Sequence, residues 1–205
     1  MLNGKFIVID GPDGAGKSTQ IKQLASFIEK SDVTVTLVRD PGGTDIGEQI
    51  RDVLLSNKNE AMGVNCEVLL FMASRAQLYA QTIKPALEAD HCVICDRWVS
   101  STIAYQAVAG KMGEKKVNRI ADECLERPWP DLTLILDVAS DVGLSRVGGN
   151  KDRMENKGAA FHQNVRDAFI AQLLGRNDFK RIDGKGNIEE VHQHIVEVIL
   201  DYVDA

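Results

Sequence analysis

The chain has 205 residues and a formal net charge of −6 at neutral pH. This length fits one domain, and an apolar fraction of 44 % is ordinary for a packed globular core. The negative charge argues against a broad nucleic-acid surface. No apolar run approaches the roughly 18 residues of a membrane span, and residues 1–5 run straight into a strand pattern, which leaves no room for a signal peptide. We therefore expect a cytoplasmic protein that binds neither nucleic acid nor membrane.

The first predicted element is a strand over residues 5–10, followed at once by the sequence GPDGAGKS at residues 11–18. Gly11 and Gly16, followed by Lys17 and Ser18, fit the phosphate-binding loop. The glycines let the backbone wrap a polyphosphate and point N–H groups at it. Lys17 adds a positive charge, the Ser18 hydroxyl can ligate Mg²⁺, and a predicted helix over residues 17–29 points its positive end at the same anion. The sequence predicts a site for a nucleoside triphosphate with Mg²⁺.

Further strands and helices alternate along the chain. Apolar runs at residues 33–39, 92–96, 132–137 and 179–183 predict strands, and helical spacing is found at residues 44–55, 67–78, 114–125, 160–174 and 188–202. This alternation predicts an α/β three-layer sandwich of the P-loop NTPase type, with a five-stranded parallel sheet flanked by helices. Ligands of such sheets bind beyond the carboxyl ends of the strands. Charged residues stand there in this chain: Asp10, Arg39, Asp40, Asp96, Arg97, Asp137 and Asp183.

Two pairs of residues resemble metal or redox motifs. Cys92 and Cys95 are three apart on a predicted strand, so their thiols point to opposite faces and we expect two buried core cysteines. His192 and His194 are two apart on a predicted helix and do not face each other, which argues against a shared metal ion.

The stretch GGNKDR at residues 148–153 interrupts the helical pattern. Glycines beside basic residues suit a mobile flap at about residues 144–158 of a single domain, and an ordinary solvated loop is the alternative. Two stretches imitate GTPase motifs. DPGG at residues 40–43 fits the first by letter, but NKDR at residues 150–153 has Arg153 where the guanine-reading Asp should stand, and no apolar strand precedes it. A GTPase is therefore disfavoured.

Several motifs follow the loop in a characteristic order. They are DPGGT at residues 40–44, FMASR at 71–75, DRW at 96–98, SSTIAYQ at 100–106 and RPWPD at 127–131. In this order they closely resemble thymidylate kinases, over nearly the whole chain. The resemblance implies the reaction ATP + dTMP → ADP + dTDP with Mg²⁺, and a homodimer formed through apolar helices such as residues 67–78. A broader deoxynucleoside monophosphate kinase is the alternative enzyme. A non-catalytic nucleotide-binding module is disfavoured by the intact Lys17, Arg97 and Arg153.

The resemblance also implies roles for individual residues. Phe71 would stack on thymine while Arg75, four residues on and so on the same helix face, bonds a base carbonyl. Tyr105 would pack under the sugar and disfavour a 2′-hydroxyl. The dTMP site would comprise Asp13, Arg51, Phe71, Arg75, Arg97, Thr102 and Tyr105, with Arg51 and Arg97 on the phosphate. The ATP site would comprise Gly11, Pro12, Asp13, Gly14, Ala15, Gly16, Lys17, Ser18, Thr19 and Arg146. The metal ligands would be Ser18 and Asp96.

Catalysis would rest on Lys17, Arg97, Asp13 and Arg153. The phosphate-binding loop holds no basic residue before Lys17, so the cation over the transferring phosphate would come from the flap, with Arg153 as the expected closing arginine. Two departures from the family pattern stand out. Asp10 and Asp40 occupy positions where many members have Glu, and the flap is shorter and less basic than expected for bacterial members.

Overall fold

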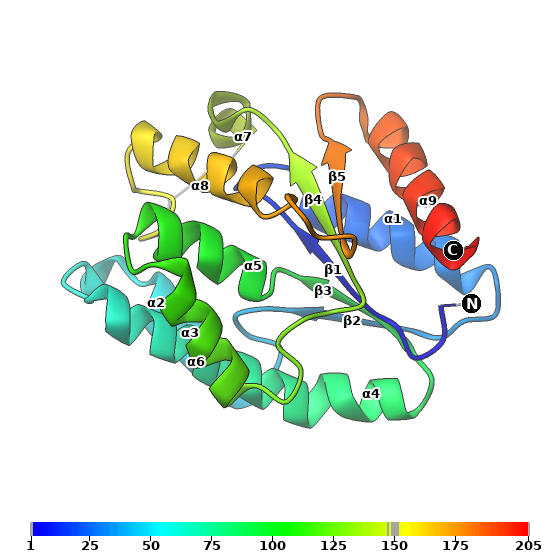
Figure 1. Cartoon of the computed structure of the whole chain (residues 1–205), viewed down its shortest axis with the longest axis horizontal. Coiled ribbons are helices and arrows are strands. Elements are labelled where there is room, and N and C mark those ends of the chain that lie inside the picture. Colours follow the sequence, from blue (N-terminus) through cyan, green and yellow to red (C-terminus); the bar gives the residue numbers. More distant parts are fainter. Residues whose placement is uncertain (1, 147, 149–151, 205) are drawn as a thin grey trace.

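A computed structural model describes residues 2–146, 148 and 152–204 of the chain. At its centre is a five-stranded, all-parallel sheet in the order β2-β3-β1-β4-β5 (Figure 1). The strands are β1 (Phe6–Asp10), β2 (Val35–Arg39), β3 (Cys92–Asp96), β4 (Leu132–Asp137) and β5 (Phe179–Asp183). The last three match the predicted ranges, and the first two begin one and two residues later than predicted. The predicted parallel α/β sandwich is confirmed.

Helices cover both faces of this sheet (Figure 1). One face packs against α1 (Lys17–Glu29) and α9 (Ile188–Asp204), because alternate strand residues such as Ile7 and Ile9 point that way. The other face packs against α3 (Val64–Leu78), α6 (Glu114–Cys124) and α8 (Ala159–Ala171). Helix α2 (Asp45–Leu55) begins after Thr44, whose side chain accepts a hydrogen bond from the Gly47 N–H at 3.0 Å.

The two cysteines of β3 behave as predicted. Cys92 packs in the core cluster on the α1 side and Cys95 in the cluster on the α3 side, and both are fully buried. Burial raises the pKa of Cys92 to about 12 and the pKa of Cys95 well above its ordinary value. Both thiols are therefore protonated core groups.

Several short elements were not predicted from the sequence. They are α4 (Lys84–Glu88), α5 (Val99–Thr102), α7 (Ser140–Arg146), a short 3₁₀ turn η1 (Asn57–Asn59) and two π-helical turns, η2 (Tyr79–Ile83) and η3 (Ile103–Ala109). Tertiary contacts explain α5 best. Asp10, at the end of β1, accepts hydrogen bonds from the hydroxyls of Ser100 (2.6 Å) and Ser101 (2.7 Å). The widened turn η3 follows directly and carries Tyr105, and such turns are frequent at functional sites.

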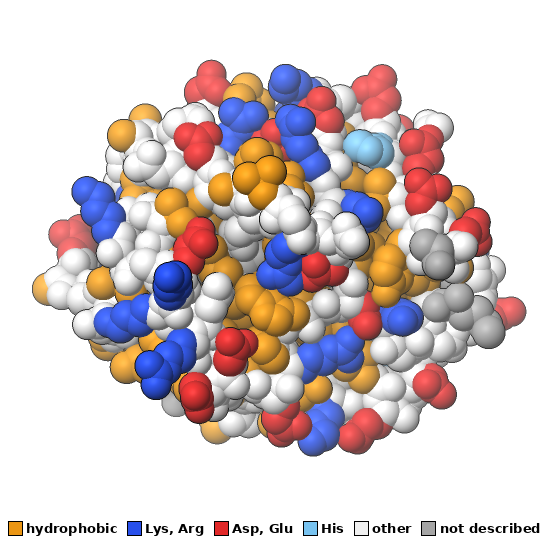
Figure 2. Space-filling view, viewed as in Figure 1, with side chains coloured by type: hydrophobic (Ala, Val, Ile, Leu, Met, Phe, Trp, Pro, Cys, Tyr) orange, Lys and Arg blue, Asp and Glu red, His pale blue; other side chains and the backbone are white. Residues whose placement is uncertain are grey.

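The surface offers no large region of one charge sign on the face drawn in Figure 2, where Lys and Arg side chains alternate with Asp and Glu. Among the helices of the described residues, none combines the length and the apolar character needed to cross a bilayer.

Candidate active site

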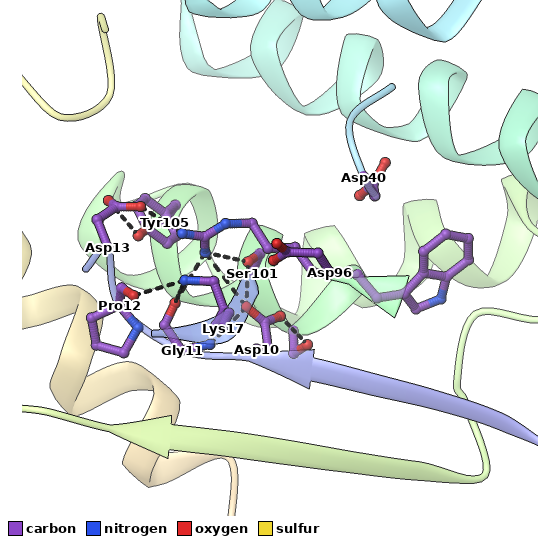
Figure 3. A network of polar contacts seen from close by, with 12 residues as sticks. Asp10, Gly11, Pro12, Asp13, Lys17, Asp40, Asp96, Ser101 and Tyr105 are labelled. Atoms are coloured by element: carbon purple, nitrogen blue, oxygen red, sulfur yellow. Dashed lines mark hydrogen bonds and ion pairs between the residues drawn. The ribbon is translucent and has the colours of Figure 1, made fainter. Parts of the chain in front are cut away.

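The phosphate-binding loop connects β1 to α1 at the carboxyl edge of the sheet (Figure 3). Gly11 (φ 139°) and Gly16 (φ 90°) both have backbone angles that favour glycine, and a Cβ on Gly11 would lie only 2.4 Å from the carbonyl oxygen of Leu136. Lys17 folds back over the loop, where its Nζ donates to the carbonyl oxygens of Gly11 (3.1 Å) and Pro12 (2.8 Å). Burial lowers the pKa of Lys17 to about 8, so a positive charge is held here with little solvation.

Helix α7 packs directly against the tip of this loop. Gly14 has a φ of 72°, and a Cβ on it would lie 1.9 Å from the carbonyl oxygen of Gly143. A Cβ on Gly143 would in turn lie 2.4 Å from the carbonyl oxygen of Asp13. The phosphate-binding pattern requires glycine at positions 11 and 16 and leaves position 14 open. Gly14 is therefore a packing requirement of this fold, which the motif alone does not reveal.

Arg97 joins the end of β3 to the loop. Its backbone is left-handed (φ 70°), which is uncommon for a residue other than glycine. Its guanidinium donates to Asp13 Oδ1 (2.5 Å), to the carbonyl oxygen of Gly11 (3.0 Å) and to Ser101 Oγ (3.0 Å). Burial alone would lower the pKa of Arg97, but Tyr105 and Asp13 outweigh it and hold the pKa above its ordinary value. The side chain is a fixed cation at the centre of the site.

Three elements meet at the Asp13 carboxylate. Arg97 comes from the end of β3, the Tyr105 hydroxyl of η3 donates to Oδ2 at 2.7 Å, and His162 Nδ1 of α8 lies 3.9 Å from the same oxygen. Burial would raise the pKa of Asp13, but the charges of Arg97 and Lys17 lower it further than burial raises it. The carboxylate is therefore ionised at neutral pH.

At the other end of the site, Arg75 and Phe71 lie on the same face of α3. Arg75 is completely buried, and its Nε and Nη2 both donate to Asp40, the former at 2.9 Å. Nη2 also donates to the Trp98 carbonyl oxygen (3.1 Å) and to Thr102 Oγ1 (3.2 Å). Burial raises the pKa of Asp40, although Arg75 opposes this. Arg75 is thus held rigidly beside Phe71.

One cavity of about 290 Å³ connects the two ends. Ten of the residues predicted for the site border it: Asp13, Lys17, Ser18, Arg51, Phe71, Arg75, Asp96, Arg97, Thr102 and Tyr105. Arg51 is partly buried and donates from Nη1 to the Pro41 carbonyl oxygen at 2.8 Å. Burial is the main cause of its lowered pKa, and the charge of Arg39 adds to the effect. The cavity is therefore lined by cations from four separate elements.

A family model described as "Thymidylate kinase" matches residues 9–195. The chain belongs to the thymidylate kinase family. It is 44 % identical over 197 residues to the thymidylate kinase of Pseudomonas fluorescens, covering 95 % of this chain and 94 % of that protein. It is 37 % identical over 199 residues to the thymidylate kinase of Fervidobacterium nodosum, and the match covers 97 % of this chain and 100 % of that protein. The crystal structure of thymidylate kinase from Ehrlichia chaffeensis is similar to this structure, with a TM-score of 0.77 at 28 % sequence identity. The match covers 97 % of this chain and 99 % of that chain.

As a member of the thymidylate kinase family the chain is a nucleoside monophosphate kinase. The prediction of Mg²⁺ can be compared with the donor atoms present. Ser18 Oγ donates to Asp96 Oδ2 at 3.2 Å, and Asp96 Oδ1 is buried with no hydrogen-bond partner among the described residues. An unsatisfied carboxylate oxygen beside a hydroxyl is a donor set of the type that Mg²⁺ prefers. The two residues fit the ion.

In this thymidylate kinase family member one residue of the predicted flap, Arg153, lies elsewhere than expected. Arg153, expected as a mobile arginine that closes over the phosphates, is 7 % exposed and does not border the cavity. Its Nη1 pairs with Glu67 Oε2 at 2.6 Å and its Nε donates to the Leu54 carbonyl oxygen at 2.9 Å. The reason is that Glu67, itself 2 % exposed, presents a buried negative charge. Arg146 ends α7 and is exposed, and Lys151 lies outside the described residues.

The lining of the cavity differs from the predicted thymidylate kinase site at several residues. Thr19 is exposed on α1 and does not border the cavity, whereas eight further residues do: Asp40, Pro41, Leu55, Ser101, Gln106, Asp152, Met154 and Glu155. The motif at residues 40–44 pointed to the first two, although only as part of the family pattern. No local signal pointed to Met154 and Glu155, because an apolar and an acidic residue inside a basic loop resemble ordinary surface sequence.

Proposed function

We propose that this chain transfers the terminal phosphoryl group of ATP to the phosphate of dTMP, giving ADP and dTDP. The observation that carries the proposal is one continuous cavity with a phosphate-binding loop at one end and the Phe71–Arg75 pair at the other. Membership of the thymidylate kinase family supports the same reaction. A phosphate oxygen of dTMP would attack the terminal phosphorus of ATP, while the bond between this phosphorus and the bridging oxygen that leaves with ADP breaks.

The acceptor would bind at the α3 end of the cavity. Phe71 supplies an apolar face for the base, and Arg75, locked by Asp40 and Thr102, presents fixed donors to a base carbonyl. Arg51 and Arg97 would hold the acceptor phosphate. Because Arg97 is already tied to Asp13 of the loop, it would bring this phosphate toward the donor without a large rearrangement.

The donor would bind over the loop, where Lys17 and the backbone N–H groups neutralise its outer phosphates. Ser18 and Asp96 would hold Mg²⁺, which when bound supplies charge neutralisation for the polyphosphate. Asp13 would keep Arg97 oriented between the two nucleotides. The homodimer and the cytoplasmic location stay predictions of the sequence.

The experiment measures ADP release from ATP with each of dTMP, dUMP, dCMP, dGMP, dAMP and UMP, with and without Mg²⁺. We expect the highest kcat/KM for dTMP and no turnover in excess chelator. Equal kcat/KM for several acceptors would favour the broader deoxynucleoside monophosphate kinase, and no turnover with any acceptor would contradict the proposal.

A further inference from the structure

Arg153 belongs to a buried polar network that the expected reaction does not use. Glu67 of α3 accepts one hydrogen bond on each carboxylate oxygen. Oε2 pairs with Arg153 Nη1 at 2.6 Å, and Oε1 accepts from Gln106 Nε2 at 2.6 Å. All three side chains are at most 7 % exposed. Because Gln106 follows Tyr105 in η3, the network connects residue 153 to the helix that borders the acceptor end of the cavity.

Arg153 is also attached to the end of α2. Its backbone N–H donates to the Leu55 carbonyl oxygen (3.2 Å) and its Nε to the Leu54 carbonyl oxygen (2.9 Å). These are carbonyl groups of the last helical turn, which lack partners within their own helix and attract cations. Helix α2 carries Arg51, and Leu55 borders the cavity. Arg153 therefore joins α2, α3 and η3, three elements around the acceptor end.

The residues on either side of Arg153 form part of the cavity wall. Asp152, Met154 and Glu155 all border the cavity. They are folded into a compact turn, in which Asp152 Oδ1 accepts from the N–H groups of Met154 (2.7 Å) and Glu155 (2.9 Å). His162 Nε2 lies 3.3 Å from the Glu155 carbonyl oxygen, on the side of the turn that faces Asp13. The position of this turn thus depends on how Arg153 is held.

We infer that Arg153 is a positioning residue, which through Glu67 holds residues 152–155 as a wall of the acceptor end, and that it governs acceptor binding more than the transfer step. The inference rests on the proposed function, which defines the acceptor end. Moving Arg153 onto the transferring phosphate would strip its cation from the buried Glu67 carboxylate, which is strongly unfavourable. Arg146, Lys151 and Lys157 are then the basic flap residues left for that phosphate.

The test compares Arg153→Met, Arg153→Lys, Glu67→Gln and the double variant Arg153→Met/Glu67→Gln with the wild type. The matched control is Arg127→Met, because Arg127 pairs with Asp131 at 2.6 Å before β4, at the opposite edge of the sheet. KM for dTMP, KM for ATP and kcat are measured separately, and the Kd of dTMP is measured by calorimetry. Hydrogen exchange of residues 152–158 reports on the wall itself.

In Arg153→Met we expect KM and Kd for dTMP to rise about tenfold or more, with kcat and KM for ATP changed less than about threefold. Exchange of residues 152–158 should become faster in this variant and stay unchanged in Arg127→Met. The double variant should bind dTMP no worse than Arg153→Met, because the two side chains act as one unit. Arg153→Lys, which keeps the charge, should recover part of the affinity for dTMP. If Arg153→Met does not fold, Arg153→Lys is used for the same comparison.

A fall in kcat of about a hundredfold with unchanged dTMP affinity would overturn the inference and identify Arg153 as the closing arginine. Unchanged dTMP affinity together with unchanged kcat would overturn it as well. Failure of the proposed function has a different signature, since the wild type itself would then show no transfer to dTMP.

Discussion

The Tyr105 hydroxyl donates a hydrogen bond of 2.7 Å to Asp13 Oδ2 (Figure 3), which joins η3 to the phosphate-binding loop through two residues that both border the cavity. Arg97 contacts the same carboxylate, and its guanidinium carbon lies 5.3 Å from the centre of the Tyr105 ring. The residue expected to select the acceptor sugar therefore also orients the loop that holds the donor. The ring and the hydroxyl of Tyr105 can be separated by mutation.

Tyr105→Phe should keep the preference for dTMP over ribothymidine monophosphate, because the ring that excludes a 2′-hydroxyl remains. Its kcat should fall about tenfold, since a hydrogen bond to the ionised Asp13 contributes roughly 1.5–3 kcal/mol. Tyr105→Ala should lose the sugar preference by about ten- to a hundredfold. Steady-state kinetics with both acceptors measure this. If Tyr105→Ala discriminates as well as the wild type, the sugar is selected elsewhere.

Lys17→Met should abolish phosphoryl transfer and change the pH dependence of stability. The pKa of Lys17 is about 8 in the folded protein and 10.5 without burial, so between these pH values the unfolded chain binds more protons at this group. The free energy of unfolding of the wild type relative to Lys17→Met should therefore rise from pH 8 to pH 10.5. The total change is on the order of 3 kcal/mol.

Urea unfolding of both proteins at a series of pH values gives this difference, in which the titration of all other groups cancels. Circular dichroism at pH 7 checks that Lys17→Met is folded. A difference that stays constant from pH 8 to pH 10.5 would contradict the buried environment of Lys17, and near-normal turnover of the folded variant would contradict its role at the phosphates.

Gly14→Ala should destabilise the protein and weaken ATP binding, because its Cβ would overlap the Gly143 carbonyl oxygen. Gly175→Ala is the matched control, since Gly175 has the same φ as Gly14 (72°) but a Cβ there would meet nothing within 4 Å. In the control the free energy of unfolding should fall by about 1–2 kcal/mol, from backbone strain alone. In Gly14→Ala it should fall by at least about 2 kcal/mol more, because of the overlap. Equal decreases in the free energy of unfolding, measured by chemical denaturation, would show that α7 does not constrain the loop.

Arg75→Lys should lower dTMP affinity without disturbing the rest of the acceptor site. Lysine keeps a cation for the buried Asp40 but loses the planar fork that fixes its donors. We expect dTMP to bind about ten- to a hundredfold more weakly, while 2-deoxyribose 5-phosphate, which has no base, binds as it does to the wild type. Calorimetry with both ligands measures this.

The lysine variant is preferred to Arg75→Ala for a structural reason. Removing the side chain altogether would leave Asp40 buried without a cation, which typically costs about 3–5 kcal/mol and confuses binding with folding. If Arg75→Lys weakens both ligands equally, Arg75 supports the pocket as a whole and does not contact the base.

Features that depend on neighbouring residues could be derived from the sequence. The loop at residues 11–18, the strand ends at Asp10 and Asp96 and the opposite faces of Cys92 and Cys95 all follow from local spacing, and each is found in the structure. The reason is that backbone periodicity and glycine placement are set within a few residues of the chain. Phe71 and Arg75 border one cavity for the same reason.

Features that depend on long-range packing were decided only by the tertiary structure. The need for glycine at Gly14 arises from the approach of α7, which no loop motif encodes. The glycines and basic residues around Arg153 in the sequence predict a mobile cation, yet in the structure Arg153 forms an ion pair with the buried Glu67 of α3. A sequence shows which residues carry charge, whereas the partner of a buried charge is chosen by the elements that the fold packs around it.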